Sequence, residues 1–420
     1  MTTRAVIVGL GYVGLPLARE AALAGLQVTG LDVSLKVVDS LNSGRSHIDD
    51  LSEADIAEMR SHGFTATSDP AVLRDADVAV ICVPTPLSDE GGPDLTAVIG
   101  ASKMIADQVH KGMLVVLEST TYPGTTDEVV RPLLEASGLK AGADFNLAFS
   151  PERIDPGNPT FGAKNTPKVV GGYTPECTDR TADFYGQFIY STVRTRGTRE
   201  AEMAKLLENT YRHVNIALVN EMARFCHDLD IDLWDVINAA KSKPFGFHAF
   251  YPGPGVGGHC IPIDPNYLSH NVEARLGYPF RFVELAQEIN SRMPAYVVER
   301  AQDLLNDREL SLKGSTVLLL GVTYKPNIAD QRESPATTVA EKLLAKGATV
   351  QFHDPFVQDW TTVPAAQRVD SAENAAAAAD LVILLQDHRS YAIEAIAQSA
   401  QAFFDTRGAV AQDGGNVSRL

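Results

Sequence analysis

The sequence is poor in cysteine and has no long apolar run. Its four cysteines are spread over 420 residues without a Cys-x-x-Cys pair, so neither a disulfide framework nor a metal site is expected. No stretch of about 18 consecutive apolar residues occurs, which argues against a membrane helix and against a signal peptide. A cytoplasmic protein with no membrane partner is therefore expected.

Basic residues are outnumbered and do not cluster along the chain. The chain has 36 Lys and Arg against 53 Asp and Glu, a formal net charge of −17, and no Lys/Arg run longer than a pair. A nucleic-acid-binding protein usually has a basic face, so nucleic acid is not an expected partner. The charge does not exclude small anionic ligands, because glycine loops and helix N-termini bind them locally.

The order strand, turn, helix, strand occurs twice in the chain. Buried strands of a parallel sheet read as continuous apolar runs, and such runs open both copies. The expected strands of the first copy are residues 5–9, 26–32, 78–83 and 114–118. Those of the second copy are residues 317–321 and 349–354, and a later buried strand lies in residues 379–385, which mirror residues 76–82. We predict an α/β fold with two Rossmann-like, doubly wound parallel-sheet domains.

A helical segment separates these two copies. Residues 198–243 contain no Gly or Pro and repeat apolar residues at three- and four-residue steps, which predicts a long helix and a second one around Leu233–Ala240. A helical middle of this size should join the domains and support a dimer. The expected domains are residues 1–195, 196–300 and 301–420, with a mobile tail after Gly408.

The first strand runs into the motif Gly-x-Gly-x-x-Gly, which then opens a helix, as a dinucleotide site requires. Gly9 permits the tight turn, Gly11 lets the backbone approach a pyrophosphate, and Gly14 lets the helix pack closely. Asp32 ends the second strand, where its carboxylate can accept both ribose hydroxyls and would repel a 2′-phosphate. NAD is therefore the expected cofactor. Lys36 either touches the ribose or is simply solvated.

The segment from residue 250 to 265 holds four glycines and several prolines, which fix a loop. Gly257 and Gly258 leave space beside Cys260, and Asp264 lies four residues further on. These are the surroundings of a reactive thiolate. The other cysteines are expected to be unreactive, two in core elements and one in a polar loop: Cys82, Cys226 and Cys177.

A nucleophilic cysteine is useful to an NAD enzyme that oxidises an aldehyde. The thiolate forms a thiohemiacetal, and loss of a hydride then gives a thioester that water can hydrolyse. Lys205 and Asn209 are four residues apart on the expected long helix, with Glu202 on the same face. They could polarise an oxygen and stabilise an oxyanion, or they could be a solvated helix face.

Seven segments of the chain resemble the nucleotide-sugar 6-dehydrogenases, the family of the UDP-glucose, UDP-N-acetylglucosamine and UDP-N-acetylmannosamine dehydrogenases. The matching segments are GLGYVGLPLA, VPTP, ESTTYPGTT, SPERIDPG, AEMAKLLENTYRHVNIALVNE, KPFGFHAFYPGPGVGGHCIPIDP and GVTYKPNIADQRESPA. The resemblance implies oxidation of a sugar C6 hydroxyl to a uronate with two NAD. It also implies a homodimer built on the long central helix.

The resemblance further implies individual roles. Cys260 would be the nucleophile, Lys205 and Asp264 would stabilise oxyanions, and Asn209 would hold the C6 oxygen. Water would be positioned or activated by Glu152 and Thr121. The remaining cofactor-binding residues would be Tyr12, Val13, Pro84, Thr85, Thr120 and Arg332. The remaining substrate-binding residues would be Arg153, Tyr251, Gly257 and Lys325.

The cysteine motif departs from that of typical UDP-glucose dehydrogenases at two positions. His259 stands where they carry Ser, and Ile263 stands where they carry Lys. The motif is more similar to that of enzymes acting on N-acetylated UDP-hexoses, which favours a UDP-N-acetylglucosamine-type substrate. UDP- or dTDP-glucose is the alternative substrate.

Two other functions fit parts of the pattern. A single-step hydroxyacid dehydrogenase also joins a Rossmann domain to a helical part with a catalytic Lys, but it needs neither Cys260 nor a second α/β domain. A non-catalytic sensor of NAD or nucleotides could use two Rossmann-like domains. A short-chain reductase is disfavoured, because no Tyr-x-x-x-Lys occurs in the chain.

Overall fold

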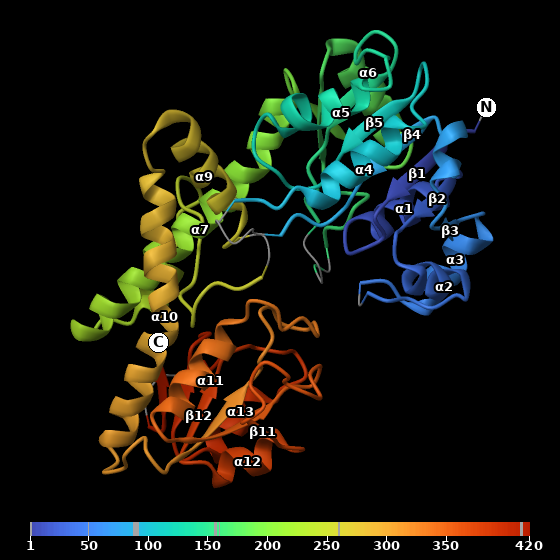
Figure 1. Cartoon of the computed structure of the whole chain (residues 1–420). Coiled ribbons are helices and arrows are strands. Elements are labelled where there is room, and N and C mark those ends of the chain that lie inside the picture. Colours follow the sequence, from blue (N-terminus) through green and yellow to red (C-terminus); the bar gives the residue numbers. More distant parts are fainter. Residues whose placement is uncertain are drawn as a thin grey trace. The chain divides into compact units, whose positions relative to one another are not determined.

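The computed structural model (Figure 1) divides the chain into two compact units. The first comprises Met1–Glu208 and Asn266–Gly277, and the second Asn209–Pro265 and Tyr278–Leu420. The structure describes residues 2–48, 50–86, 92–154, 158, 160–258, 261–411 and 415–420. Across these residues no helix has the length and apolarity that a membrane span requires.

The first unit is built on an eight-stranded sheet in the order β3-β2-β1-β4-β5-β6-β7-β8. Its strands are β1 Arg4–Val8, β2 Gln27–Leu31, β3 Thr65–Thr67, β4 Val78–Ile81, β5 Leu114–Leu117, β6 Asn146–Phe149, β7 Lys168–Gly172 and β8 Thr192–Arg194. All neighbouring strands are parallel except β6 and β7, which are antiparallel. The strand order reverses at β1, where doubly wound sheets bind their ligands.

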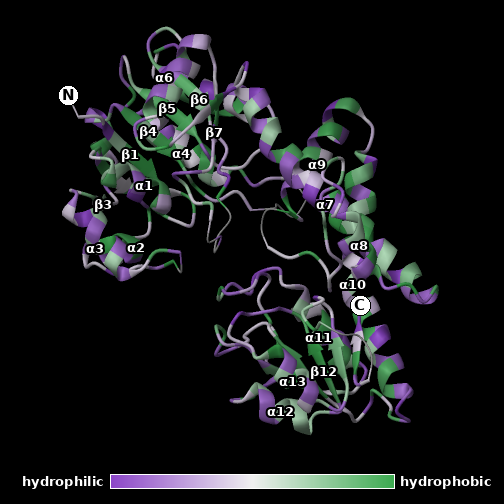
Figure 2. Cartoon of the chain, turned by 180° about the vertical axis from the view of Figure 1, so that it is seen from behind, coloured by the Kyte–Doolittle hydropathy of each residue, from purple (hydrophilic) through white to green (hydrophobic). Residues whose placement is uncertain are grey.

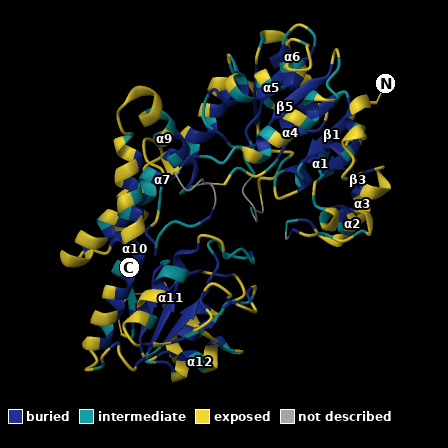
Figure 3. Ribbon diagram, in the orientation of Figure 1, coloured by how far each residue is buried: buried dark blue, intermediate teal, exposed yellow. Residues whose placement is uncertain are grey.

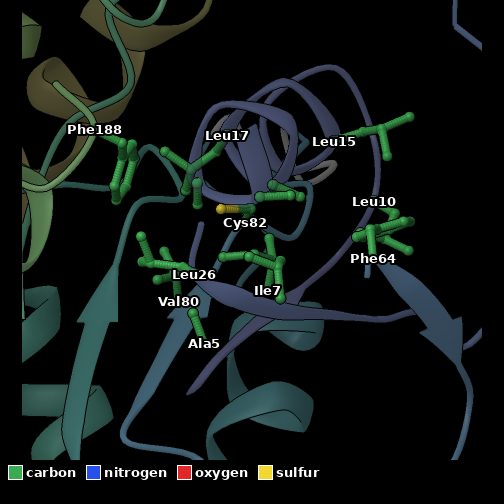
Figure 4. Close-up of a cluster of buried hydrophobic side chains, with 14 of the residues drawn as sticks. Ala5, Ile7, Leu10, Leu15, Leu17, Leu26, Phe64, Val80, Cys82 and Phe188 are labelled. Carbon is green, nitrogen blue, oxygen red and sulfur yellow. The ribbon is translucent and has the colours of Figure 1, made fainter. Parts of the chain in front are cut away.

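Helices complete the first unit. They are α1 Gly14–Leu23, α2 Leu35–Asn42, α3 Glu53–Ser61, α4 Thr96–Ala106, α5 Arg131–Glu135, α6 Pro175–Tyr185, the part of α7 Thr198–Asp228 up to Glu208 and most of α9 Asp264–Leu276. A 3₁₀ turn, η1 Pro70–Asp75, and a π turn, η2 Thr126–Val130, also belong to this unit. Successive residues of β1 enter different core clusters, Ile7 on one face of the sheet and Val8 on the other. Both faces are therefore buried, which explains the unbroken apolar runs. Figure 4 shows the cluster around Ile7 and Cys82.

The second unit contains a six-stranded, fully parallel sheet in the order β11-β10-β9-β12-β13-β14. Its strands are β9 Thr316–Leu320, β10 Thr349–His353, β11 Gln367–Arg368, β12 Leu381–Leu384, β13 Phe403–Asp405 and β14 Val417–Arg419. Its helices are α8 Leu233–Ala240, α10 Arg281–Asn306, α11 Pro335–Ala345, α12 Ala372–Ala378, α13 Ile393–Ser399 and the part of α7 Thr198–Asp228 that follows Glu208. Apolar residues concentrate on the central strands of both sheets (Figure 2).

The predicted fold class and the predicted helical segment are confirmed. Each expected strand lies within two residues of an observed strand, and the second helix of the middle segment is Leu233–Ala240. The three-domain division stays a prediction.

Two local expectations were wrong. The tail after Gly408 is not mobile where it is described, because Val417–Arg419 pairs with β13 as the last strand of the sheet, and the indole nitrogen of Trp234 donates to the backbone carbonyl of Leu420 at 3.1 Å. Cys177 does not lie in a polar loop. It is fully buried in the first turn of α6, where the hydroxyl of the helix cap Thr174 accepts its N–H.

Candidate active site

The glycine turn after β1 has the shape that a dinucleotide requires. Gly9 has a φ of +94°, and a Cβ there would lie 2.7 Å from the carbonyl oxygen of Cys82. A Cβ on Gly14 would lie 1.9 Å from the oxygen of Gly9, whereas one on Gly11 would meet no atom within 4 Å. The turn therefore leaves room beside Gly11. No side chain caps the start of α1, so its N–H groups can face a pyrophosphate.

Asp32 follows β2 and orders the two loops beside it. One carboxylate oxygen accepts the N–H of Leu10 at 2.9 Å, and the other accepts the N–H of Ser34 at 2.8 Å. The residue is half-buried, and each oxygen can accept a further bond, so the ribose hydroxyls can still bind. Lys36 is exposed and lines a surface depression with Arg45 and others. These residues fit NAD.

The loops after β4 and β5 are tied to each other. The Thr85 hydroxyl donates to the carbonyl oxygen of Thr120 at 2.7 Å, and the Ser119 hydroxyl donates to that of Val83 at 2.7 Å. The hydroxyl of Tyr267, from α9, donates to the carbonyl oxygen of Thr85. The predicted cofactor residues Thr85 and Thr120 therefore share one rigid edge beside the glycine turn.

Glu202 of α7 holds the loop that follows Thr121. Its carboxylate accepts the N–H of Gly124 at 2.5 Å, the N–H of Thr126 at 2.9 Å and the Thr126 hydroxyl at 2.7 Å. Burial raises the pKa of Glu202 to about 7, although these bonds oppose the rise. Thr121 itself is buried, and within the described part of the chain its hydroxyl has no hydrogen-bond partner. The sequence placed Glu202 on the correct helix face without revealing this contact.

The buried Lys205 and the largely buried Glu152 form a pair in the first unit. The Lys205 Nζ lies 3.9 Å from Glu152 Oε2, and the other oxygen of Glu152 accepts the N–H of Ile154. Burial raises the pKa of Glu152, while the positive charge of Lys205 lowers it. The interpretation of Lys205 as part of a solvated face is therefore wrong, because the residue is buried.

Arg153, predicted to bind substrate, makes protein contacts. Its Nη2 lies 2.8 Å from Glu208 Oε1, and its Nη1 donates to the carbonyl oxygen of Pro167 at 2.7 Å. These contacts connect the loop after β6 to α7 and to the residue before β7.

In the second unit, Asn209 and Asp264 are joined directly. The Asn209 Nδ2 donates to Asp264 Oδ2 at 2.7 Å, and both residues are buried. Asp264 opens α9 directly after the cysteine loop. Cys260 and His259 lie outside the described residues. The contact brings two predicted catalytic residues together although 54 residues separate them in the sequence.

The glycines before Cys260 are explained by close packing in the second unit. A Cβ on Gly257 would lie 2.6 Å from the carbonyl oxygen of Glu333, and one on Gly258, whose φ is +86°, would lie 2.7 Å from the Tyr324 ring. The N–H of Gly253 donates to Asn220 Oδ1 at 2.9 Å. The loop therefore packs on the segment between β9 and α11, which carries the predicted residues Lys325 and Arg332.

That segment is held by a buried pair. His388 Nδ1 accepts the N–H of Asn327 at 2.9 Å, and His388 Nε2 lies 3.0 Å from Asp354 Oδ2. Arg332 forms a two-pronged contact with Asp330, at 2.6 and 2.9 Å. No motif or spacing in the sequence indicates the His388–Asp354 pair.

Tyr251 lies in a different part of the second unit's surface. Its ring stacks on Trp234 at a centroid distance of 5.6 Å, and its hydroxyl accepts from Lys241 at 3.3 Å. All three line a depression of about 610 Å³ that also includes Arg407 and Arg419. The described residues include no group of three His, Cys, Asp or Glu side chains able to hold a metal ion.

A dinucleotide turn, an acidic residue at the end of the second strand and buried Lys–Glu and Asn–Asp pairs define an NAD-dependent dehydrogenase. Models of the UDP-glucose/GDP-mannose dehydrogenase family match three segments: the NAD binding domain at residues 3–189, the central domain at 199–292 and the UDP binding domain at 318–412. The chain belongs to this family. It is an NAD-dependent nucleotide-sugar dehydrogenase, as the resemblance implied.

Relatives with established names agree with this assignment. The UDP-N-acetyl-D-mannosamine dehydrogenase of Pyrococcus horikoshii is 34% identical over 392 residues, which are 92% of this chain and 90% of that protein. The UDP-N-acetyl-D-glucosamine 6-dehydrogenase of Pseudomonas aeruginosa is 37% identical over 354 residues, 84% of this chain and 82% of that protein. The solved structure of the Pyrococcus horikoshii enzyme matches with a TM-score of 0.88 at 32% identity and covers 99% of this chain and 98% of that one.

Proposed function

We propose that the protein oxidises the C6 hydroxyl of a UDP-linked N-acetylhexosamine to the carboxylate, in two steps that pass through Cys260. The observation that supports this most directly is the buried Asn209–Asp264 contact beside the end of the cysteine loop. Oxidation of an alcohol to an acid removes two hydrides from the same carbon, and bound NAD supplies the acceptor for each.

The chain's own residues carry out the rest of the reaction. The Cys260 thiolate adds to the aldehyde formed in the first step, giving a thiohemiacetal. Its oxygen is stabilised by donors such as Lys205 and Asn209. After the second hydride has left, the sulfur holds a thioester. Water, held by Thr121 and deprotonated by Glu152, attacks the thioester carbonyl, and the Cys260 sulfur leaves as thiolate. Asp264 organises proton transfer near that sulfur.

Binding roles follow the motif positions. We propose that the cofactor is held by the glycine turn with Tyr12 and Val13, by Asp32 and Lys36, by the strand-end residues Pro84, Thr85 and Thr120, and by Arg332. The substrate contacts are Arg153, Tyr251, Gly257 and Lys325. These residues fall in the proposed domains 1–195, 196–300 and 301–420, which bind NAD, carry the cysteine loop and bind the nucleotide of the sugar, respectively.

The substrate class is inferred from the cysteine motif and from the relatives. His259 and Ile263 distinguish the loop from that of typical UDP-glucose dehydrogenases. Relatives named for UDP-N-acetyl-D-mannosamine and UDP-N-acetyl-D-glucosamine support an N-acetylated hexose. A panel of UDP- and dTDP-hexoses assayed for NADH formation tests this. Preference for UDP- or dTDP-glucose would establish the alternative substrate.

We also propose a homodimer in the cytoplasm. Large apolar side chains are exposed along the two long helices, and Figure 3 shows exposed stretches on α10. On α7 they are Leu207, Tyr211, Leu218 and Phe225, and on α10 they are Phe282 and Leu285. An exposed apolar stripe of this kind is typical of a subunit interface. Light scattering after gel filtration should give twice the chain mass, and Leu218→Glu should reduce it to that of the monomer.

The stoichiometry of NADH formation tests the chemistry. The native enzyme should form two NADH per substrate, and Cys260→Ala should lose net oxidation to the acid by orders of magnitude. Cys226→Ala is the matched control, since that thiol is buried in a core cluster of α7 and α8. One NADH per substrate would instead indicate a single-step hydroxyacid dehydrogenase. Unchanged turnover in Cys260→Ala would falsify the covalent route.

A further inference from the structure

The first unit contains a buried ion pair that the proposed mechanism does not use. Glu118 directly follows β5, and its Oε2 lies 2.9 Å from the Nζ of Lys168, the first residue of β7. The Glu118 carboxyl group is almost inaccessible, and the Lys168 side chain is about one-tenth exposed. Taking two charges out of water is costly and seldom improves stability. The pair therefore calls for a function.

A tyrosine fixes this pair in place. Tyr185, the last residue of α6, is fully buried, and its hydroxyl donates to Glu118 Oε1. The Lys168 ammonium also lies 5.1 Å from the centre of the Tyr185 ring. Both oxygens of Glu118 thus have a partner. An ammonium has three N–H donors, and within the described residues its one ion-pair partner is Glu118.

The sheet topology places this pair at the edge of the sheet where β5 and β6 end. Glu118 and Glu152 follow the carboxyl ends of β5 and β6, which are parallel neighbours. Since β7 is antiparallel to β6, its first residue lies at that same edge. In the pairing of β6 with β7, Ala148 lies opposite Gly172 and Phe149 lies opposite Gly171. If this register is extended beyond Phe149, Lys168 lies opposite Glu152.

A small cavity connects the pair to Glu152. It has a volume of about 20 Å³, and its lining includes the charged residues Glu118, Glu152, Arg153 and Lys168 together with apolar side chains such as that of Leu17 in α1. A cavity of about 10–15 Å³ suffices for one water if two to four polar groups are available to bind it. The spare N–H donors of Lys168 and the two carboxylates meet that condition.

We propose that Glu118, Lys168 and Tyr185 are positioning residues that hold one water against the Glu152 carboxylate and balance its charge. The inference rests on the proposed function, in which Glu152 must be ionised to activate water. Glu118 alone would repel a second carboxylate, and Lys168 alone would over-stabilise it as an anion. As a pair they keep Glu152 ionised while leaving it basic enough to accept a proton.

The groups around Glu152 all act in directions consistent with this arrangement. Burial raises the pKa of Glu152, while Lys205 from α7 and Lys168 from β7 lower it and Glu118 raises it. Cys82, after β4, is neutral, because burial and the charge of Glu118 raise the pKa of its thiol well above the usual value. The same influences keep the Tyr185 hydroxyl protonated as a donor.

Two substitutions that remove charges of opposite sign test the proposal. Lys168→Met should move the acid limb of the kcat–pH profile up by about one pH unit, and Glu118→Gln should move it down by about as much. Lys168→Arg, which keeps the charge, should restore the native profile. A purely structural role would lower activity in both variants without opposite shifts. An unmoved limb, or shifts of the same sign, would overturn the proposal.

Folding and function are separated by two further measurements. Breaking a buried ion pair is strongly destabilising, so if Lys168→Met does not fold, the downward shift in Glu118→Gln decides the question.

Glu152→Gln should abolish the acid limb and lower kcat by about 100-fold. If it does neither, the proposed function of Glu152 fails. If Glu152→Gln has both effects while Lys168→Met and Glu118→Gln leave the acid limb unmoved, only the inference about the Glu118–Lys168 pair fails.

A crystal structure of the native enzyme gives a readout independent of kinetics. Electron density for a single water should lie within hydrogen-bond distance of Lys168 Nζ and of the Glu152 carboxylate. A dry or collapsed cavity would contradict the proposal.

Discussion

Asp32 and Asp354 occupy equivalent positions in the two sheets and make the same pair of backbone hydrogen bonds. Asp32 Oδ2 accepts the N–H of Leu10 at 2.9 Å, and Asp354 Oδ2 accepts that of Val322 at 2.7 Å. In each case the other oxygen accepts the N–H two residues further along the chain, at 2.8 Å. They differ in that Asp354 is fully buried against His388, whereas Asp32 is half-buried. Only Asp32 therefore retains an accessible edge for a ribose.

Replacing Asp32 should weaken NAD binding. Asp32→Ala removes the acceptor of the ribose hydroxyls and also frees the N–H groups of Leu10 and Ser34, which order the turn. We expect a loss of roughly 1–3 kcal/mol in binding free energy, measured by calorimetric titration with NAD. Asp75→Ala, at an exposed position of the same unit, should bind NAD as the native protein does. Unaltered affinity in Asp32→Ala would show that the cofactor lies elsewhere.

The loop before Cys260 should not tolerate a methyl group at Gly257. A Cβ there would lie 2.6 Å from the carbonyl oxygen of Glu333 and 2.8 Å from the Cβ of Tyr324. Gly257→Ala must therefore displace the loop or the segment after β9, and KM for the nucleotide sugar should rise at least about tenfold. Gly100→Ala in α4 is the control, because a Cβ there meets no atom within 4 Å. It should keep native kinetics, and native kinetics in Gly257→Ala would refute the packing argument.

The parts of the fold that the sequence predicted well are those whose signals are local. Strands buried on both faces are apolar runs, so they are recognisable without their neighbours. An N-cap serine followed by a first-turn proline, as at Ser334-Pro335, is a local signal for a helix start, and α11 begins at Pro335. The same signature at Thr174-Pro175 opens α6. Read as a helix start, this signature places Cys177 in α6 and not in a loop.

The parts that the sequence did not reveal depend on contacts between distant residues. The three members of the Glu118–Lys168–Tyr185 cluster come from two strand ends and a helix, and no spacing in the chain relates them. The edge strand at Val417–Arg419 is only three residues long, too short for a pattern. Residue types at the proposed site could be predicted from motifs, but their hydrogen-bond partners could not.

Lys205 should affect turnover more than substrate binding. Its ammonium is buried beside Glu152, where it can stabilise developing negative charge. We expect Lys205→Ala to lower kcat by about 100-fold or more with a much smaller change in KM. Lys103→Ala removes an exposed lysine on α4 and is the control for a general loss of positive charge. Steady-state kinetics of the two variants separate the effects. A change confined to KM would contradict the oxyanion role.

Glu202 should make the stability of the enzyme depend on pH in a recognisable way. Burial raises its pKa from 4.5 to about 7 in the folded protein, so the folded state binds more protons than the unfolded state between these values. The stabilisation due to this proton is fully present below about pH 4.5 and is lost as the pH rises through about 7. The difference corresponds to about 3 kcal/mol.

Glu202→Gln removes the titration, although the amide must also face the N–H groups of Gly124 and Thr126. Its free energy of unfolding should therefore be lower at low pH but flatter between pH 4.5 and 7 than that of the native protein. Urea unfolding at a series of pH values measures both slopes. Glu53→Gln, an exposed residue at the start of α3, should retain the native slope. Parallel curves for Glu202→Gln and the native protein would mean that Glu202 stays ionised throughout, held by its three donors.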